Sequence, residues 1–380
     1  MNGEHFMKFK NPMISGYYPD PSVCRVGNKF YMVCSSFQYF PGVPLFESDD
    51  LINWIQIGYC LTRNSQLPLE TATSSGGIFA PTIRYYDGRF YMTTTNTTTG
   101  GNFFVWTDDI YGEWSEPIYI DQEGIDPSLY FENGKAYFMS NGADSAILQC
   151  EIDIKTGKKL SDGVVLWRGT GGRYPESPHL YKIGDYYYLM LAEGGTEYGH
   201  MVTYARSKEI NGPYTPYAKN PVLTNRNKGG YSIQAVGHAD LIQDTNGNWW
   251  MYHLGFRQID RWLTFHHLGR EVFLMPVTFD DEGWFTVGDD GTTTEYVETD
   301  RISDNVTQNF VSEYTFNNVK TNPNWQYLRN YDSSDYILLD DSIKLRGTQI
   351  TIDEPKSPTF ICLHQKEFDM NLTCDVKIYD

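Results

Sequence analysis

A short pattern recurs five times along the first 250 residues of the chain and constrains its fold more than any other feature. Most copies begin with a small or acidic residue, and each runs into a hydrophobic strand, turns at a glycine and returns through a run rich in Tyr, Phe and Trp. The five copies begin at Asp20, Ala80, Asp126, Glu176 and His238. Their turns fall at Gly27-Asn28, Asp87-Gly88, Asn133-Gly134, Gly184-Asp185 and Asn246-Gly247. Such dipeptides between β-rich runs indicate hairpins, because their residues accept a positive φ.

The spacing of the copies indicates the architecture. Successive copies begin 46 to 62 residues apart, and repeats of about 40–50 residues with roughly four strands each are typical of β-propeller blades. The composition agrees, since 16% of the residues are aromatic and 34 are glycine, which favours strands and tight turns over helices. We therefore predict an all-β protein in which residues 1–300 form a five-bladed β-propeller.

The repeat ends near residue 300, and a different β-rich pattern follows. Short runs compatible with strands occur at 312–316, 325–329, 333–345, 349–352, 359–363 and 371–380. We predict that residues 301–380 form the N-terminal part of a β-sandwich domain. Because the last run stops inside an expected strand, we also expect the native protein to be longer or the reading frame to be truncated.

Charge and cysteine content narrow the classes of partner and compartment. The net charge of −18 argues against a nucleic-acid partner, which needs a clustered basic face. No run of apolar residues is long enough to span a membrane, and the first ten residues carry no apolar stretch of the kind found in signal peptides. The six cysteines include no Cys-x-x-Cys pair. We expect a cytoplasmic protein with buried free thiols, and the sequence leaves homo-oligomer formation open.

The first residues of the repeats predict a functional site. The first strand of each propeller blade lines the central channel, so the five starting residues should face one cavity. Three of them, Asp20, Asp126 and Glu176, carry carboxylates. A single Asp before Pro-Ser often only caps a turn, but three acids at equivalent repeat positions favour a shared function.

Carboxylates grouped in this way suit glycoside hydrolysis. That reaction needs one ionised carboxylate to activate water and one protonated carboxylic acid to give a proton to the leaving oxygen. Asp20 lies between two prolines, which fix its backbone, and we predict that it is the base. Glu176 has the longer side chain, and burial beside other acids would raise its pKa, so we predict that it is the acid.

Other polar residues have two interpretations each. His238 is either a hydrogen-bonded core histidine or part of the site. Arg270 either pairs with its neighbour Glu271 or holds a carboxylate or a sugar hydroxyl. His253, His266 and His267 lack the spacing of helical zinc ligands, and we predict no transition-metal site.

Several segments resemble glycoside hydrolase family 43, in particular its β-xylosidase and α-L-arabinofuranosidase members. These segments are 16–22 (GYYPDPS), 36–43 (SFQYFPGV), 50–54 (DLINW), 124–129 (GIDPSL), 174–181 (YPESPHLY), 236–240 (VGHAD) and 268–271 (LGRE). The resemblance runs through nearly the whole chain in one order. It implies that Asp20 is the general base, Glu176 the general acid and Asp126 the carboxylate that tunes the acid.

The resemblance also implies substrate-binding roles. Phe37 matches an aromatic residue of the terminal sugar subsite, His238 lies in the floor of the funnel, and Arg270 lies near the base and the substrate. Phe79 stands where xylosidase relatives often carry Trp, which changes the pocket wall. In the relatives, a loop of the C-terminal sandwich helps to close the pocket. No cofactor is implied as a requirement, although related arabinanases hold Ca²⁺ near a histidine, and His238 could offer such a site.

The function predicted from sequence is an inverting, exo-acting hydrolase that releases terminal xylose or L-arabinofuranose from xylan-derived or arabinoxylan-derived oligosaccharides. Alternatives are a lectin-like propeller without catalysis, an endo-arabinanase and another five-bladed glycosidase. A retaining fructan hydrolase is disfavoured, because the Trp-Met-Asn-Asp-Pro and Arg-Asp-Pro signatures expected of that group are absent.

Overall fold

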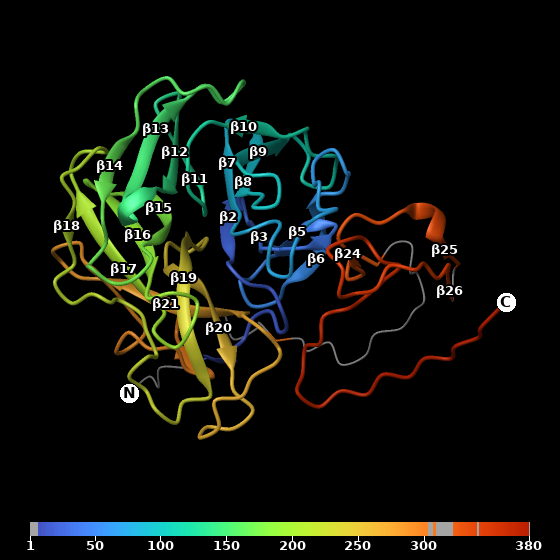
Figure 1. The fold of residues 1–380 in the computed structure, drawn as a ribbon. Helices are drawn as coiled ribbons and strands as arrows, with labels where there is room; N and C mark the ends of the chain where they lie inside the picture. Colours follow the sequence, from blue (N-terminus) through green and yellow to red (C-terminus); the bar gives the residue numbers. More distant parts are fainter. Residues whose placement is uncertain (1–6, 303–306, 309–321, 340–341, 380) are drawn as a thin grey trace.

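Five four-stranded antiparallel sheets form a propeller in the computed structural model, which describes residues 7–302, 307–308, 322–339 and 342–379 (Figure 1). The first blade contains β2 (Ser22–Val26), β3 (Lys29–Val33), β5 (Gly42–Ser48) and β6 (Ile55–Leu61). The second contains β7 (Thr82–Tyr86), β8 (Arg89–Thr95), β9 (Asn102–Thr107) and β10 (Ile118–Ile120). The third contains β11 (Ser128–Glu132), β12 (Lys135–Asn141), β13 (Ile147–Ile152) and β14 (Val164–Trp167).

The last two blades continue the same order from the centre outward. The fourth contains β15 (Glu176–Ile183), β16 (Tyr186–Glu193), β17 (Met201–Ser207) and β18 (Thr215–Pro216). The fifth contains β19 (Ile233–Gln243), β20 (Trp249–Arg257), β21 (Glu271–Phe279) and β22 (Phe285–Val287). The prediction of an all-β, five-bladed propeller is confirmed.

The first two strands of every blade form the hairpin that the sequence predicts. The turn dipeptides lie between the paired strands in all five blades. Asp87 and Gly88 have φ values of 48° and 82°, and Asn133 and Gly134 have values of 51° and 78°. These left-handed conformations explain why Asp, Asn and Gly occupy the turns.

The ring closes through contacts between neighbouring first strands. Strand β19 of the last blade packs beside β2 of the first, and β1 (Met7–Lys10) pairs with β23 (Tyr296–Thr299). The third residue of the repeat links adjacent blades. The Ser22 hydroxyl donates to Asp240 (2.6 Å), the Thr82 hydroxyl to the Pro127 carbonyl (2.9 Å) and the Ser128 hydroxyl to the Pro178 carbonyl.

A charged network at the centre of the ring joins four blades, and we call it the core cluster: Ser22, Arg84, His179, Tyr181 and Asp240. Arg84 donates to both oxygens of Asp240 (2.8 and 3.2 Å) and contacts His179 Nδ1 (2.8 Å). The Tyr181 hydroxyl also donates to Asp240. Since Asp240 has no solvent exposure, its charge is balanced entirely within the protein.

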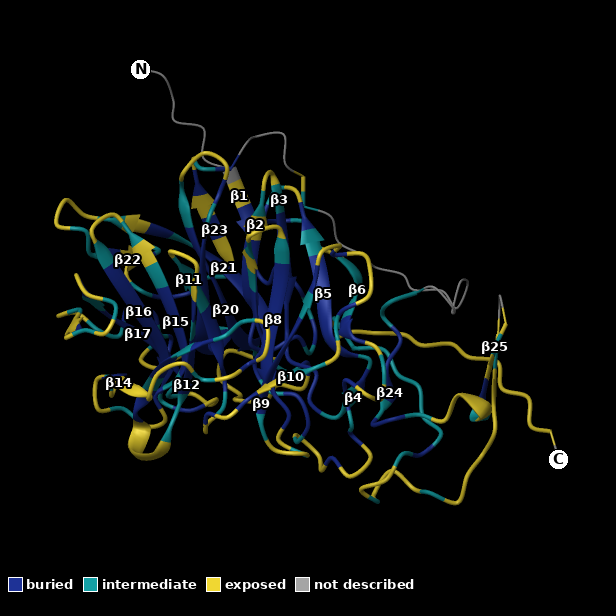
Figure 2. Cartoon of the chain, turned by 90° about the horizontal axis from the view of Figure 1, so that it is seen from above, coloured by how far each residue is buried: buried dark blue, intermediate teal, exposed yellow. Residues whose placement is uncertain are grey.

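The core lies between the blades and consists mainly of aromatic and aliphatic side chains. Trp250, Tyr188, Tyr204 and Phe285 are among the largest fully buried residues. Buried strand segments fill the propeller in Figure 2, whereas much of the exposed chain lies in loops. All six cysteines are free, and four of them are buried. In the part of the chain that the structure describes, no helix is long and apolar enough to cross a membrane.

The C-terminal residues extend away from the propeller beside its first blade (Figure 1). Strand β24 (Tyr327–Leu328) pairs with β4 (Tyr39–Phe40) of the first repeat, and β25 (Tyr336–Leu338) pairs with β26 (Ile343–Leu345). The helical content of the described residues is confined to two single-turn 3₁₀ helices, η1 (Ala143–Ser145) and η2 (Ser333–Asp335).

The predicted β-sandwich is only partly represented. The runs expected at 325–329 and 333–345 contain strands, but those expected at 349–352, 359–363 and 371–379 do not. Cys362 makes one isolated bridge to Gln326, and the run at 312–316 lies outside the described residues. The strand predictions beyond residue 345 were therefore wrong for this structure, because short alternating runs form ladders only where a partner strand is present. The sandwich and the boundary at residue 300 stay predictions.

Candidate active site

Asp20 lies at one end of the central channel, just before β2, in a left-handed conformation (φ 59°). It is buried, with 4% of its surface exposed. Arg270 Nη1 donates to Asp20 Oδ1 (3.0 Å), the Ser35 hydroxyl donates to Oδ2, and His238 Nδ1 lies 3.6 Å from Oδ1. Burial opposes ionisation, but Arg270, His238 and Ser35 together outweigh it and lower the pKa of Asp20 below its ordinary value. Asp20 is therefore the ionised carboxylate of the site.

Glu176 and Asp126 have the opposite electrostatic behaviour. Burial, and then the negative charge of Asp20, raise the pKa of Glu176 to about 7. Burial, and then the charges of Glu176 and Asp20, raise the pKa of Asp126 well above its usual range. The three acids are thus close enough to influence one another, and we call them, with His238 and Arg270, the funnel cluster.

Left-handed backbone conformations recur around these acids. Asp126 has a φ of 53°, Ser177 of 55° and His238 of 49°. The pairing of β15 with β16 shifts between Glu176 and His179, and the pairing of β19 with β20 shifts on both sides of Gly237. Such conformations are uncommon for residues other than glycine and concentrate at functional sites. Here they occur at members of the funnel cluster and at Ser177, the residue after Glu176.

Arg270 resolves one of the alternatives left by the sequence. It pairs with Asp20, whereas Glu271 pairs with Arg257 (2.8 Å). Burial opposes the charge on Arg270, but Asp20 outweighs it and raises the pKa of the guanidinium. Its guanidinium carbon also lies 5.3 Å from the centre of the Phe37 ring. Arg270 therefore joins the ionised acid to the aromatic wall of the site.

The aromatic wall consists of Tyr17, Phe37 and Phe79. The ring of Phe37 stacks with that of Tyr17 (centroids 5.8 Å apart) and tilts against that of Phe79 (5.5 Å). Phe37 is held by two backbone hydrogen bonds with Ile78 (2.9 and 3.0 Å). A Cβ atom on Gly77 would lie 2.2 Å from the Phe37 carbonyl oxygen, so glycine is required there. The structure thus brings Phe37 and Phe79 into contact, and their role in substrate binding stays a prediction.

His238 is held by its neighbours and lies beside Asp20. Its Nε2 lies 2.9 Å from the Ser177 hydroxyl, and burial lowers its pKa. The ring of buried His200 packs against the backbone at Gly237, where a Cβ atom would lie 2.5 Å away. No sequence motif predicts a role for His200, because only the fold brings it next to Gly237, the neighbour of His238.

The described residues give limited support for a metal ion. They contain no group of three or more His, Cys, Asp and Glu side chains arranged to hold one. Calcium takes six to eight oxygen ligands, whereas His238 offers one nitrogen and already contacts Ser177. These residues do not form a calcium site by themselves, and the Ca²⁺ expectation stays a prediction. The three histidines considered for a transition metal have separate contacts: His253 is buried and bonded to Thr293, His266 stacks on Phe256, and His267 contacts Phe368.

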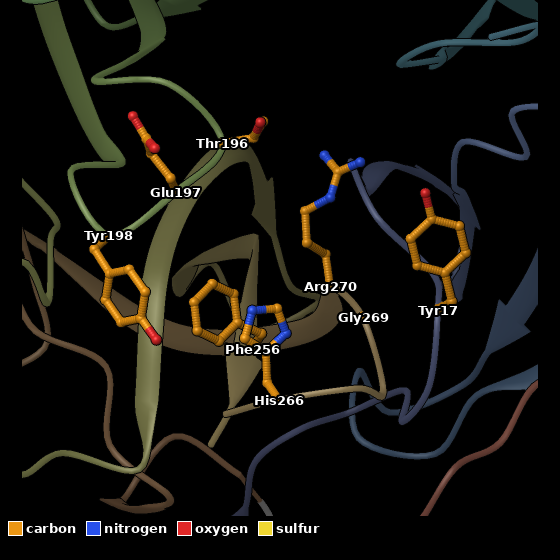
Figure 3. Close-up of a pocket in the computed structure, with 8 residues that line it drawn as sticks. All are labelled: Tyr17, Thr196, Glu197, Tyr198, Phe256, His266, Gly269 and Arg270. Atoms are coloured by element: carbon orange, nitrogen blue, oxygen red, sulfur yellow. The ribbon is translucent and has the colours of Figure 1, made fainter. Parts of the chain in front are cut away.

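A cavity of about 260 Å³ opens beside the funnel cluster (Figure 3). Its lining residues are Tyr17, Thr196, Glu197, Tyr198, Phe256, His266, Gly269 and Arg270. In Figure 3 the Arg270 side chain projects between Tyr17 and the loop that carries Thr196. No motif in the sequence predicts a role for the loop 196–198. Tyr17 was not predicted as a site residue either, although it lies in the same short motif as Asp20.

The comparisons with known proteins agree with this geometry. The model of glycosyl hydrolases family 43 matches residues 9–285. A non-reducing end α-L-arabinofuranosidase of Bacteroides ovatus is 42% identical over 97% of this chain and 70% of its own length. A xylosidase/arabinosidase of Butyrivibrio fibrisolvens is 40% identical over 97% of this chain and 74% of its own length.

Solved structures show the same relationship. The structure of GH43B of a Bacteroides ovatus xyloglucan PUL superposes with a TM-score of 0.89 at 41% identity, over 95% of this chain and 73% of that one. A xylan β-1,4-xylosidase of Bacillus halodurans gives a TM-score of 0.86 at 32% identity, over 94% and 72%. A five-bladed propeller with clustered acids and these relatives is a glycoside hydrolase. The chain belongs to glycosyl hydrolase family 43.

Proposed function

We propose that the protein removes terminal xylosyl or L-arabinofuranosyl residues from the non-reducing ends of oligosaccharides, with inversion at the anomeric carbon. The observation that carries this proposal is the difference between two acids in one funnel. Asp20 has a lowered pKa, and Glu176 has a pKa of about 7. An inverting hydrolase needs one ionised and one protonated carboxyl group in this way.

The proposed reaction assigns a separate role to each acid. Asp20 takes a proton from a water molecule as the water oxygen bonds to the anomeric carbon. Glu176 gives its proton to the glycosidic oxygen as the bond between that oxygen and the anomeric carbon breaks. Asp126, whose own pKa responds to the charge of Glu176, would tune the acid, and Arg270 keeps Asp20 ionised. The sugar would lie against Phe37 and Phe79, with His238 in the floor.

The names of the relatives support the choice of sugars. One is named for a non-reducing end α-L-arabinofuranosidase activity, another for both xylosidase and arabinosidase activities. Xylan-derived or arabinoxylan-derived oligosaccharides would carry both sugars. Phe79 at the pocket wall is the residue that we expect to bias the choice between them.

Two nitrophenyl glycosides test the proposal. We expect release of nitrophenol from 4-nitrophenyl β-D-xyloside, 4-nitrophenyl α-L-arabinofuranoside or both, and proton NMR should show the inverted anomer as the first product. The ratio kcat/KM should fall as the pH rises above about 7, because Glu176 then loses the proton that it must donate. Release from neither glycoside would exclude the proposed substrate class, and a retained first anomer would exclude the inverting mechanism.

The same assays separate the alternatives. A lectin-like propeller would bind sugars without hydrolysis, and exchange of Asp20 or Glu176 would not alter its measured function. An endo-arabinanase would shorten linear arabinan internally and release little free arabinose at first. Product analysis by chromatography distinguishes internal cleavage from release of single sugars.

A further inference from the structure

A carboxylate outside the funnel cluster is held in an unusual way. Glu193 is the last residue of β16, and none of its surface is exposed. It accepts four hydrogen bonds, from Thr170 N (2.9 Å), Thr170 Oγ1 (3.0 Å), Gly172 N (3.0 Å) and Thr203 Oγ1 (2.6 Å). All four donors are neutral. The side-chain oxygens are therefore held by oriented amide and hydroxyl groups, as in the anion-binding concavities that backbone amides form.

The segment around Glu193 has glycines where its backbone comes close to the Glu193 carboxylate. A Cβ atom on Gly169 would lie 2.7 Å from one oxygen of the Glu193 carboxylate, and one on Gly172 would lie 2.7 Å from the other. The backbone of Gly169 also has a φ of 69°. Larger residues at these positions would separate the loop from the carboxylate, so the glycines and Glu193 form one unit.

This unit lies immediately before the proposed acid. Residues 173–175 connect Gly172 to Glu176, and Tyr174 in this connection has a φ of 51°. The Arg173 carbonyl accepts from Gly194 N (2.7 Å), and Glu176 is paired with Ala192 in the ladder. The segment that precedes Glu176 is thus tied to the end of β16 at the Glu193 carboxylate and at the Gly194 amide. A change at Glu193 would release one of these two ties.

We infer that Glu193 is a positioning residue, which fixes segment 169–175 so that the Glu176 carboxyl reaches the glycosidic oxygen. The inference rests on the proposed role of Glu176 as general acid. Glu193 itself contacts no reacting atom. Its influence should therefore be confined to the proton transfer that Glu176 performs, and it should vanish where the leaving group needs no proton.

The substitution Glu193→Gln tests this inference. The glutamine amide has nearly the same shape as the carboxylate. Its NH₂ group, however, would face donors that now bond to a carboxylate oxygen, so segment 169–175 would lose hydrogen bonds to residue 193. With the phenyl glycoside of the preferred sugar, whose leaving group needs protonation, we expect kcat to fall about 30-fold. With the 2,4-dinitrophenyl glycoside, we expect kcat to stay within about threefold of that of the native protein, because dinitrophenolate leaves without a proton.

Two further variants keep the test decisive. Glu132 also accepts from two hydroxyl groups, those of Tyr130 and Tyr187 (3.2 and 2.7 Å), but it lies at the hairpin end of β11. Glu132→Gln should change the two substrates equally. Thr170→Val removes one donor from an exposed position and leaves the carboxylate in place, so it can be measured even if Glu193→Gln does not fold. We expect it to reduce the phenyl glycoside rate by about fivefold and the dinitrophenyl rate by less than about twofold.

The outcomes separate this inference from the proposed function. Equal losses on both leaving groups in Glu193→Gln, or in Thr170→Val if the first variant does not fold, would show that Glu193 only stabilises the fold and would overturn the inference. Unchanged rates on both substrates would overturn it as well. A native protein that hydrolyses neither glycoside would overturn the proposed function, and the inference with it.

Discussion

The funnel cluster and the core cluster have neighbouring members at the first strands of the blades, yet their charges are balanced differently. Asp20 lies two residues before Ser22, and His238 lies two residues before Asp240. In the core cluster, the buried Asp240 faces the partly exposed Arg84 and receives further hydrogen bonds from Ser22 and Tyr181. In the funnel cluster, three acids share one Arg. The core cluster therefore contains one acidic side chain for its one arginine, whereas the funnel cluster contains three acidic side chains for its one arginine.

The difference in charge balance gives the acids of the two clusters different pKa values. The pKa of Asp240 is lowered, because Arg84, His179 and Ser22 together outweigh the effect of burial. In the funnel cluster only Asp20 shows a lowered pKa among the three acids, and the surplus acids keep their protons to higher pH. A buried ion pair that loses one partner destabilises a protein strongly, whereas acids held protonated by their neighbours can serve as proton donors.

Asp20→Asn should have the largest effect on activity. The amide cannot take a proton from water, so we expect kcat to fall about 10⁴-fold on nitrophenyl glycosides. The melting temperature should change little, because the substitution also removes a buried negative charge near two other acids. Steady-state rates and thermal unfolding measure the two quantities. A rate for the Asp20→Asn variant above about a tenth of the native rate would contradict the role of Asp20 as base.

Asp240→Asn should have the largest effect on stability. Arg84, whose side chain is 16% exposed, would remain beside a fully buried position without its counterion, and we expect the free energy of unfolding to decrease by about 3 kcal/mol. The effect should be greatest near neutral pH and should shrink as the pH falls below the ordinary pKa of Asp, since the lowered pKa stabilises only the ionised form. Denaturant unfolding at several pH values measures this dependence.

The exposed pair of Arg89 and Asp108 (2.6 Å) provides a control for Asp240. Asp108→Asn should change the free energy of unfolding far less than Asp240→Asn, because exposed ion pairs contribute little. Equal losses at Asp240 and Asp108 would show that the core cluster is not a special source of stability. The rate per folded molecule of Asp240→Asn should stay within about threefold of that of the native protein if the two clusters are independent.

Arg270→Met should shift the pH dependence of catalysis. The base must be ionised, and Arg270 lowers the pKa of Asp20. Removal of an opposite charge raises that pKa by about 1–3 units, so the acid limb of kcat/KM should move to higher pH by a similar amount. Rates measured from about pH 3.5 to about pH 8 cover the limb. Arg84→Met should lower the melting temperature and leave the limb in place, and an unmoved limb in Arg270→Met would contradict the proposed pairing.

Local chemistry explains which parts of this structure the sequence predicts. The hairpins follow from dipeptides such as Asp87-Gly88, whose conformational preference depends on no distant residue. The convergence of Asp20, Asp126 and Glu176 follows from the repeat, because equivalent blade positions face one channel. The choice of Asp20 as the partner of Arg270 depends on a contact across 250 residues, and the sequence alone left that choice open.

Other features have no local signal. Glu193 and His200 lie in no recurring pattern, and their roles depend on loops that fold around them. The left-handed conformation of His238 occurs next to a shift in strand pairing. The alternation of residues along β19 does not predict this shift. The strands expected at 349–352 and 371–379 were predicted from alternation, but alternation predicts a ladder only where a second strand lies alongside.

Glu176→Gln should have a modest effect on stability, opposite in sign to that of Asp240→Asn. The raised pKa of Glu176 means that the folded protein binds a proton that the unfolded chain has released between about pH 4.5 and about pH 7. The contribution of Glu176 to stability is therefore present at low pH and is lost as the pH rises through this range. Glutamine carries no such proton, so the variant should match the native protein near pH 4.5 and exceed its stability at about pH 8.

The size of this gain follows from the shift. Each pKa unit corresponds to about 1.4 kcal/mol, and partial exposure of Glu176 reduces the effect, so we expect a gain of ~2 kcal/mol at about pH 8 from denaturant unfolding. The same variant should lose activity on phenyl glycosides. If Glu176→Gln is more stable but less active, and Asp240→Asn is less stable but equally active, the funnel cluster serves catalysis and the core cluster serves stability. A Glu176→Gln variant without a pH-dependent gain would mean that Glu176 is not held protonated in the folded protein.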